Sequence, residues 1–136
     1  TDYLGRIPHG EVAKQMAHCR AGVALLRPGK NTNGHSGTMG NTKIFEEMMA
    51  GLPVICTDFS LWREFVERYH CGVCVDPEDV DQVVLALRRL LEHPEEARQM
   101  GENGRRAVRE AFNWSVEEQT LLGLYRDLSG SCDKGR

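Results

Sequence analysis

The chain has 136 residues, of which 27% are charged, with a formal net charge of -3 and a pI of about 5.9. This length accommodates one domain with a modest core and excludes two complete domains. The slight acidic balance leaves no basic footprint, which argues against nucleic acid as the main partner.

The composition also bears on the cellular compartment. No apolar stretch reaches the roughly 20 residues that a membrane-spanning helix requires, and the first residues carry no signal-peptide pattern. The cysteine count is five, an odd number, and Cys56 and Cys74 lie inside apolar, strand-like runs. We therefore expect reduced thiols and a cytoplasmic protein rather than a disulfide framework.

The first third of the chain predicts a strand, a helix, a second strand and a loop. Residues 3–7 are expected to end a strand, because Pro8 cannot continue a ladder. Apolar side chains at i, i+4 and i+7 predict a short helix over residues 11–19. The apolar run 21–26 predicts a buried strand, and residues 29–41, rich in glycine and asparagine, predict a loop too polar to join the core.

The middle of the chain continues the alternation. A short helix follows Asn41 and stops near Gly51, and an apolar β-branched run predicts a third strand over residues 53–57. A helix over 61–69 and a fourth strand over 72–75 follow. Alternating strands and helices indicate an α/β fold with a mainly parallel sheet of about four strands.

Three helices are expected at the end of the chain. Asp79, three residues before Gln82, predicts an N-cap. Pro94 suits the first turn of the next helix, and Ser115 opens the last one. The apolar face of the first of these helices is formed by Val80, Val83, Val84, Leu87, Leu90 and Leu91. The face of the second is formed by Ala97, Met100, Gly101, Gly104, Ala107, Val108 and Ala111, with the two glycines indicating close packing.

The loop and helix at residues 34–51 form the strongest candidate site. Backbone N–H groups around Asn41 and Thr42, at a positive helix end beside Lys43, could face a diphosphate, and Glu46 could accept ribose hydroxyls. An ordinary loop followed by a solvated Lys43/Glu46 pair explains the same spacing. The motif is not a P-loop, which would require glycine in place of Thr42.

A CxxC motif at Cys71–Cys74 leads into a strand, where residues three apart point to opposite faces. A zinc site would need two further ligands, and a redox motif should open a helix. We therefore interpret these cysteines as small core residues.

The segment NTKIFEEMMAGLPVICTDFSLWREFVE resembles the nucleotide-sugar-binding segment of the family-four glycosyltransferases of GT-B fold, which typically reads (P/N)-T-K-(L/I)-F-E-x-M-x-A-G-x-P-V-I. CGVCVDPEDV, MGENGRRAV and FNW also resemble that family's C-terminal half. The resemblance implies a Rossmann-like three-layer sandwich that is an incomplete C-terminal half of the GT-B fold with extra C-terminal helices. Residues 1–128 would form the partial nucleotide-sugar-binding domain, and residues 129–136 a disordered tail.

The same resemblance implies roles for individual residues. Glu46 matches the glutamate that binds the ribose, and Thr42 and Lys43 match the helix start beside the diphosphate. Thr38 stands where many members carry a glutamate that faces the donor sugar, so this sequence does not identify the sugar. The predicted donor site comprises Arg6 and Ile7, near the base, with Thr38, Gly40, Asn41, Thr42, Lys43 and Glu46.

The activity implied by the resemblance is retaining transfer of a hexose from a nucleotide-diphosphate sugar to an acceptor hydroxyl, without a metal or other cofactor. The acceptor, a glycan or lipid-linked sugar, would be held by an N-terminal domain, in an enzyme of polysaccharide synthesis that could associate peripherally with a membrane. We expect this chain to be a fragment that binds nucleotide weakly if at all and is inactive alone. The competing hypothesis is a stand-alone α/β binding or regulatory module without catalytic activity.

Overall fold

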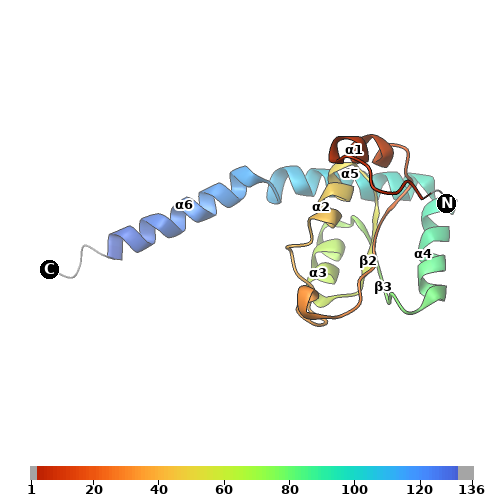
Figure 1. The fold of residues 1–136 in the computed structure, drawn as a ribbon, viewed down its shortest axis with the longest axis horizontal. Coiled ribbons are helices and arrows are strands. Elements are labelled where there is room, and N and C mark those ends of the chain that lie inside the picture. The colour runs from red at the N-terminus through yellow and green to blue at the C-terminus, as the bar shows by residue number, and fades with distance from the viewer. Residues whose placement is uncertain (1–2, 132–136) are drawn as a thin grey trace.

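The computed structural model describes residues 3–131 of the chain (Figure 1). Strands and helices alternate through the first half, and three helices follow one another at the end. The elements are α1 (His9–Met16), β1 (Gly22–Ala24), the 3-10 helix η1 (Lys30–Thr32), α2 (Thr42–Met49), β2 (Val54–Thr57), α3 (Ser60–Tyr69), β3 (Gly72–Val75), α4 (Val80–Glu92), α5 (Pro94–Ala111) and α6 (Trp114–Ser131).

The sheet is parallel, with the strand order β1-β2-β3 within the described residues. Gly22 pairs with Val54, and Val54 pairs with Gly72, so the strands begin in register. The α/β fold and the parallel sheet are confirmed, but the sheet has three strands where about four were expected.

The strand expected over residues 3–7 is the one that the structure contradicts. This segment is extended chain with a bend, Tyr3 is 95% exposed, and Gly5 adopts a φ of 65°. Pro8 then leads directly into α1 as its N-cap. A strand requires a neighbour to accept its backbone hydrogen bonds, and a local sequence pattern cannot show whether that neighbour is present.

Helices cover both faces of the sheet. On one face α2, α3 and α5 pack around the larger core, which includes Met48, Trp62 and Val108. On the other face α4 packs with the start of α5 on Ile55 and Val75. This arrangement confirms the Rossmann-like three-layer sandwich, with the sheet between two helical layers (Figure 1).

Local signals account for the start and packing of the long helices. The Asp79 side chain accepts a hydrogen bond from the Gln82 N–H at 3.1 Å, as expected of an N-cap. Pro94 is the first residue of α5. Gly101 lies against the turn after α2, and a Cβ at this position would lie 2.0 Å from the Gly51 carbonyl oxygen. The predicted cap and close glycine packing are therefore both confirmed.

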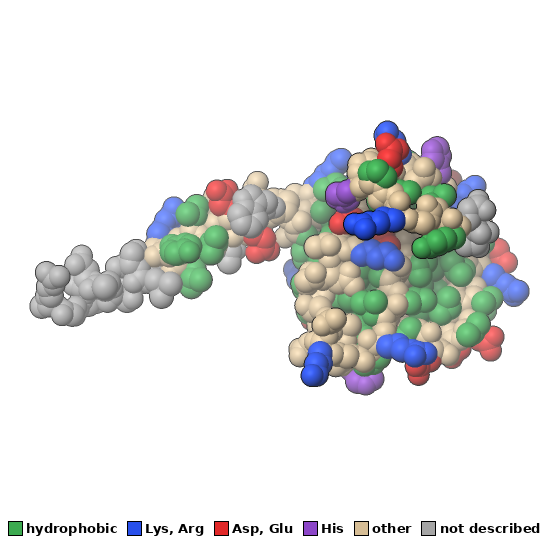
Figure 2. Space-filling view, in the orientation of Figure 1, with side chains coloured by type: hydrophobic (Ala, Val, Ile, Leu, Met, Phe, Trp, Pro, Cys, Tyr) green, Lys and Arg blue, Asp and Glu red, His purple; other side chains and the backbone are tan. Residues whose placement is uncertain are grey.

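The apolar face predicted for α4 is only partly buried. Leu90 is 3% exposed, whereas Val80 and Leu91 are 71% and 62% exposed. A sheet of three strands is too narrow to cover a helix face of this width, so its margins remain open. Figure 2 shows hydrophobic side chains gathered in a hollow framed by α1 and α4.

The last helix, α6, extends away from the sandwich (Figure 1). Leu124 and Tyr125 are 56% and 64% exposed. The helix runs to Ser131, so it includes the first three residues of the expected tail, while residues 132–136 lie outside the described part of the chain. Within the described residues, no helix combines the length and the apolar character needed to cross a bilayer.

Candidate functional site

The loop between β1 and α2 leaves the sheet at a point fixed by Thr57. The Leu26 N–H donates a hydrogen bond to the Thr57 hydroxyl at 2.7 Å, and this hydroxyl donates to the Leu26 carbonyl at 2.8 Å. These bonds join the segments that follow β1 and β2, beyond the last pair of residues in register, Ala24 and Cys56. The loop therefore starts at the carboxyl edge of the sheet, where ligands bind in open α/β proteins.

The loop itself is held by side chains. The Thr32 hydroxyl accepts from the Gly29 N–H at 2.8 Å, and the Trp62 indole N–H donates to the Thr38 carbonyl at 3.0 Å. Gly37 has a φ of 80° and lies against Phe59, whose Cβ would be 2.8 Å from an added Cβ. Thr32 is 4% exposed although this loop is polar, because its hydroxyl is bonded to the backbone of the loop itself. No described residue of the loop belongs to either buried core, and Met39 packs at the margin of the larger one.

The loop ends in a capped helix. The Asn41 side-chain oxygen accepts from the Lys43 N–H at 3.3 Å, which makes Asn41 the N-cap of α2. One turn earlier, the Thr38 hydroxyl accepts from the Gly40 N–H at 3.1 Å. The positive end of the α2 dipole is thereby directed at the space enclosed by the loop.

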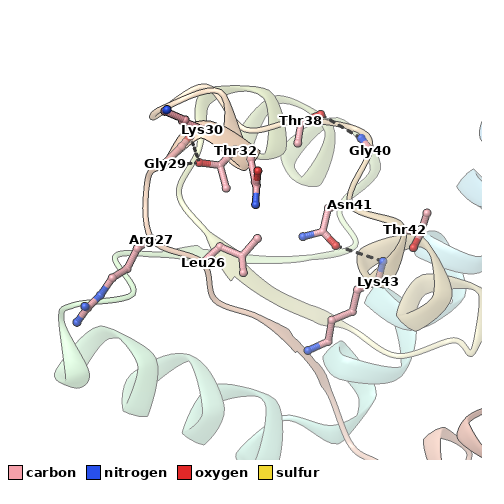
Figure 3. Close-up of a pocket in the computed structure, with 11 residues that line it drawn as sticks. Leu26, Arg27, Gly29, Lys30, Thr32, Thr38, Gly40, Asn41, Thr42 and Lys43 are labelled. Atoms are coloured by element: carbon pink, nitrogen blue, oxygen red, sulfur yellow. Dashed lines mark hydrogen bonds between the residues drawn. The ribbon is translucent and has the colours of Figure 1, made fainter.

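That space is a cavity of about 950 Å³ (Figure 3). Its described lining contains three basic residues and no acidic one. Figure 3 shows Arg27 pointing away from its centre, and the Arg27 Nε lies 3.2 Å from Glu78 Oε1. The lining residues are Leu26, Arg27, Gly29, Lys30, Asn31, Thr32, Thr38, Gly40, Asn41, Thr42 and Lys43. An anion such as a phosphate matches this combination of lysines, polar groups and helix end.

The predicted donor site is split by the structure. Five of its residues, Thr38, Gly40, Asn41, Thr42 and Lys43, line the large cavity. Glu46 is exposed and lines two neighbouring cavities of about 670 and 570 Å³. Thr42 lines both the large cavity and the one of about 670 Å³, so the two adjoin. Arg6 and Ile7 are absent from the described lining of the large cavity.

Sequence reasoning missed the first half of this lining. Lys30 and Thr32 come from the loop directly after β1. The run Arg27-Pro28-Gly29-Lys30 at the end of a predicted strand was the available signal, since basic residues there fall on the carboxyl edge of a parallel sheet. This half of the lining could have been predicted from the order of the strands and helices alone.

Glu47, the neighbour of Glu46, occupies an unexpected environment. It is 3% exposed, and its Oε1 lies 3.9 Å from the Lys43 ammonium. Its Oε2 has no hydrogen-bond partner among the described residues. Burial raises the pKa of this carboxyl, and the charge of Lys43 and the Val23 N–H oppose that rise. The buried carboxyl group of α2 thus belongs to Glu47, a residue that the sequence analysis did not select as a candidate.

The CxxC cysteines are packed in the sheet. Cys71 is 0% exposed, and burial raises the pKa of its thiol to about 12. The Sγ of Cys74 lies 3.7 Å from that of Cys56 on the neighbouring strand. These contacts confirm the interpretation of the motif as small core residues.

A family model described as "Glycosyl transferase-like" matches residues 1–123. The chain belongs to this glycosyltransferase family. The match covers both helical layers, the sheet and the loop that forms the large cavity.

Two similar proteins agree with this assignment. The chain is 40% identical over 78 residues to an MMP alpha-(1->4)-mannosyltransferase of Mycolicibacterium hassiacum, over 56% of this chain and 19% of the relative. It superposes on a sucrose-phosphate synthase of Thermosynechococcus elongatus with a TM-score of 0.74 and 28% identity, over 96% of this chain and 30% of that one. The chain is therefore a GT-B glycosyltransferase domain that spans less than a third of either relative's length.

Proposed function

We propose that this chain is the donor-nucleotide-binding portion of a retaining glycosyltransferase, which transfers a hexose from a nucleotide-diphosphate sugar to an acceptor hydroxyl. The observation that carries the proposal is the cavity at the N-terminus of α2. Its described lining combines Lys30 and Lys43 with a capped helix end and no carboxylate. Family membership supports the reaction class, and the composition of the cavity supports the position that we propose for the charged group of the donor.

In this proposal the diphosphate lies in the large cavity. The positive end of α2 and the Lys43 ammonium stabilise its charge, and the charge that develops on the leaving group during transfer is stabilised by the same groups. Lys30 lines the opposite side of the cavity, on η1, and its ammonium is directed away from the cavity centre (Figure 3), from where a rotation of the flexible side chain would bring it to the anion. These residues take the part that a metal ion plays in other phosphate chemistry, so we propose a reaction that needs no metal or other cofactor.

The ribose is proposed to contact Glu46. A carboxylate accepts hydrogen bonds from both hydroxyls of a ribose. Thr42 lines both the large cavity and the neighbouring cavity that Glu46 lines. A donor whose diphosphate lies in the first cavity could therefore place its nucleoside in the second. Arg6 and Ile7 are retained as the proposed contacts of the base, on the segment that precedes α1.

The acceptor is proposed to bind to another domain of the parent enzyme, in the cytoplasm. Residues 1–128 would then be the donor-binding part, unable to transfer sugar alone. The competing function, a stand-alone binding module, would use the same cavity without any transfer. Sugar transfer by a protein that contains this domain, lost on Lys43→Met, separates the two.

The binding site is tested by NMR titration of the ¹⁵N-labelled chain with UDP, GDP and ADP sugars. We expect weak, millimolar-range binding, with the largest shifts at the amides of Gly40, Asn41 and Lys43. Lys43→Met should weaken it about tenfold, as the loss of a charge-assisted contact does. Lys14→Met, which removes an exposed lysine on α1 paired with Glu11, is the matched control. Absence of shifts around α2 with all three nucleotides would overturn the proposal.

A further inference from the structure

The pair formed by Lys43 and Glu47 joins the cavity to the interior of the domain. Lys43 lines the cavity and its side chain is 59% exposed, whereas the side chain of Glu47 is 4% exposed. Their charged groups are 3.9 Å apart, at the outer limit of an ion pair. The ammonium group can therefore exchange this partner for an anion in the cavity by a rotation of its own flexible side chain.

Glu47 lies in a space that fits its carboxyl group closely. An added Cβ at Gly22 of β1 would lie 2.5 Å from the Glu47 Cδ, so only glycine permits this approach. The second carboxylate oxygen has no hydrogen-bond partner in the described residues. A buried carboxylate without full hydrogen bonding is costly while it is charged, and the cost disappears when it is protonated.

Few other charges act on this carboxyl group. Within α2 they are Lys43 and the exposed Glu46, whose negative charge also raises the pKa of Glu47. The strand β1 contributes only Gly22 and the Val23 backbone. Arg105, the basic residue of α5 at the end of α2, donates to the carbonyls of Met49 and Ala50 instead. Lys43 is therefore the principal cation that opposes the rise in the pKa of Glu47.

We propose that a diphosphate bound in the cavity draws the Lys43 ammonium away from Glu47, and that Glu47 then takes up a proton from solvent. This inference rests on the proposed function, since it places the donor diphosphate beside Lys43. The one bond formed is the O–H bond of the Glu47 acid, whose proton comes from solvent. Lys43 keeps its charge, the Glu47 carboxylate becomes a neutral acid, and the domain gains one positive charge as the anion binds.

This exchange makes Glu47 a positioning residue for the cavity lysine. While the cavity is empty, the buried carboxylate holds the ammonium near the cavity floor. With an anion present, protonation removes the competing charge, so donor binding becomes tighter as the pH falls towards the range in which Glu47 titrates.

The test uses inorganic pyrophosphate and the chain labelled with ¹³C at glutamate carboxyls. The Glu47 carboxyl carbon, assigned through its own backbone, reports its protonation directly, so the proton equilibria of pyrophosphate do not affect the reading. We expect saturation with pyrophosphate to raise the apparent pKa of Glu47 by about 1–3 pH units, the shift that a close opposite charge produces. The carbon of Glu64, exposed on α3, serves as the internal control and should not move.

Two variants give independent results. Lys43→Met should raise the apparent pKa of Glu47 without any ligand. Glu47→Gln, which mimics the protonated acid, should tighten pyrophosphate binding at pH 7.5 by about tenfold, one pKa unit of coupling. A purely structural role would instead weaken binding. Pyrophosphate that binds at α2 without changing the Glu47 titration would overturn this inference alone, whereas absence of binding at α2 would overturn the proposed function as well.

Discussion

The two ends of α2 lie in very different environments. The N-terminal end faces a polar cavity and is held by one side chain, the Asn41 cap. The C-terminal end is packed: Met48 is 0% exposed, and Arg105 donates to the carbonyls of Met49 and Ala50 at 3.1 and 2.7 Å. The eight residues of α2 thus join an end that lines the cavity to an end whose carbonyl groups are hydrogen-bonded by α5.

Because of this difference, substitutions at the two ends of α2 should affect different properties, folding stability at one end and ligand affinity at the other. Substitutions at the C-terminal end should lower the free energy of unfolding, because they disturb backbone packed against backbone. Substitutions at the N-terminal end should change ligand affinity, with smaller effects on folding. Five variants or conditions test whether the two ends differ in this way, and they are given in order of the expected effect on stability.

The largest effect is expected for Gly101→Ala. The new methyl group would lie 2.0 Å from the Gly51 carbonyl oxygen, which is backbone and cannot rotate away. We expect a loss of about 3 kcal/mol in the free energy of unfolding, measured by urea denaturation. Gly123→Ala in α6, where nothing lies within 4 Å of the added carbon, is the control and should be neutral or slightly stabilising. Equal stability of the two variants would show that α5 does not anchor α2.

Arg105→Ala should have the next largest effect. It removes two hydrogen bonds from a cation to carbonyls at the C-terminal end of α2, and we expect a loss of about 1–2 kcal/mol. Arg106→Ala, which removes an arginine bonded to Asn103 within the same helix, is the matched control. A melting temperature that falls equally in both variants would contradict the specific role of Arg105.

Asn41→Ala acts at the other end of the helix. Loss of the cap should cost about 1 kcal/mol of stability and weaken pyrophosphate binding. Asn41→Asp separates these effects, because an aspartate keeps the cap but places a negative charge at the cavity. We expect the aspartate variant to retain wild-type stability in thermal unfolding and to lose binding. Unchanged pyrophosphate affinity in Asn41→Asp would show that the anion lies elsewhere.

The pH dependence of stability should reveal Glu47. Its pKa is raised above the ordinary value of 4.5, so the folded protein holds the proton more tightly than the unfolded chain. Stability is therefore highest below pH 4.5 for this group alone and falls as the pH rises through the folded-state pKa. Glu47→Gln should remove that decline, measured as a flatter dependence of the free energy of unfolding on pH. A wild-type decline that persists in the glutamine variant would have to come from another group.

Glu46→Ala should have the smallest effect on stability, within about 0.5 kcal/mol, because the side chain is exposed. It should weaken nucleotide binding while leaving pyrophosphate binding unchanged, since pyrophosphate carries no ribose. Both affinities can be read from the same NMR titrations. An equal loss for both ligands would place Glu46 at the diphosphate instead.

The sequence was sufficient to predict most of the local structure. The Asp79 cap, Pro94 at the start of α5 and the glycines of its inner face all depend on neighbours within one helix or one turn. The motif around Lys43 identified the cavity, because its position after a strand and before a helix already places it at the carboxyl edge of a parallel sheet.

Features that depend on distant parts of the chain were predicted less well. The apolar face of α4 was correctly placed on one side, but periodicity does not show how wide the surface beneath is, so the exposure of Val80 and Leu91 was missed. The strand predicted over residues 3–7 was wrong for a related reason, because a local pattern does not show whether a neighbouring strand is present. The adjacent residues Glu46 and Glu47 point to different sides of α2, and Glu47 lies against β1, where Gly22 leaves room for its carboxyl group.

The loop bonds of Thr32, Thr57 and Trp62 have a consequence for the energetics of recognition. The backbone around the cavity is ordered by hydrogen bonds within the protein itself, from those of Leu26 with Thr57 to the Asn41 cap. Under the proposed function, a donor would lose its own freedom on binding but would not have to order the loop. Differences in affinity between donors should therefore arise from the chemistry of the ligand rather than from the conformational entropy of the protein.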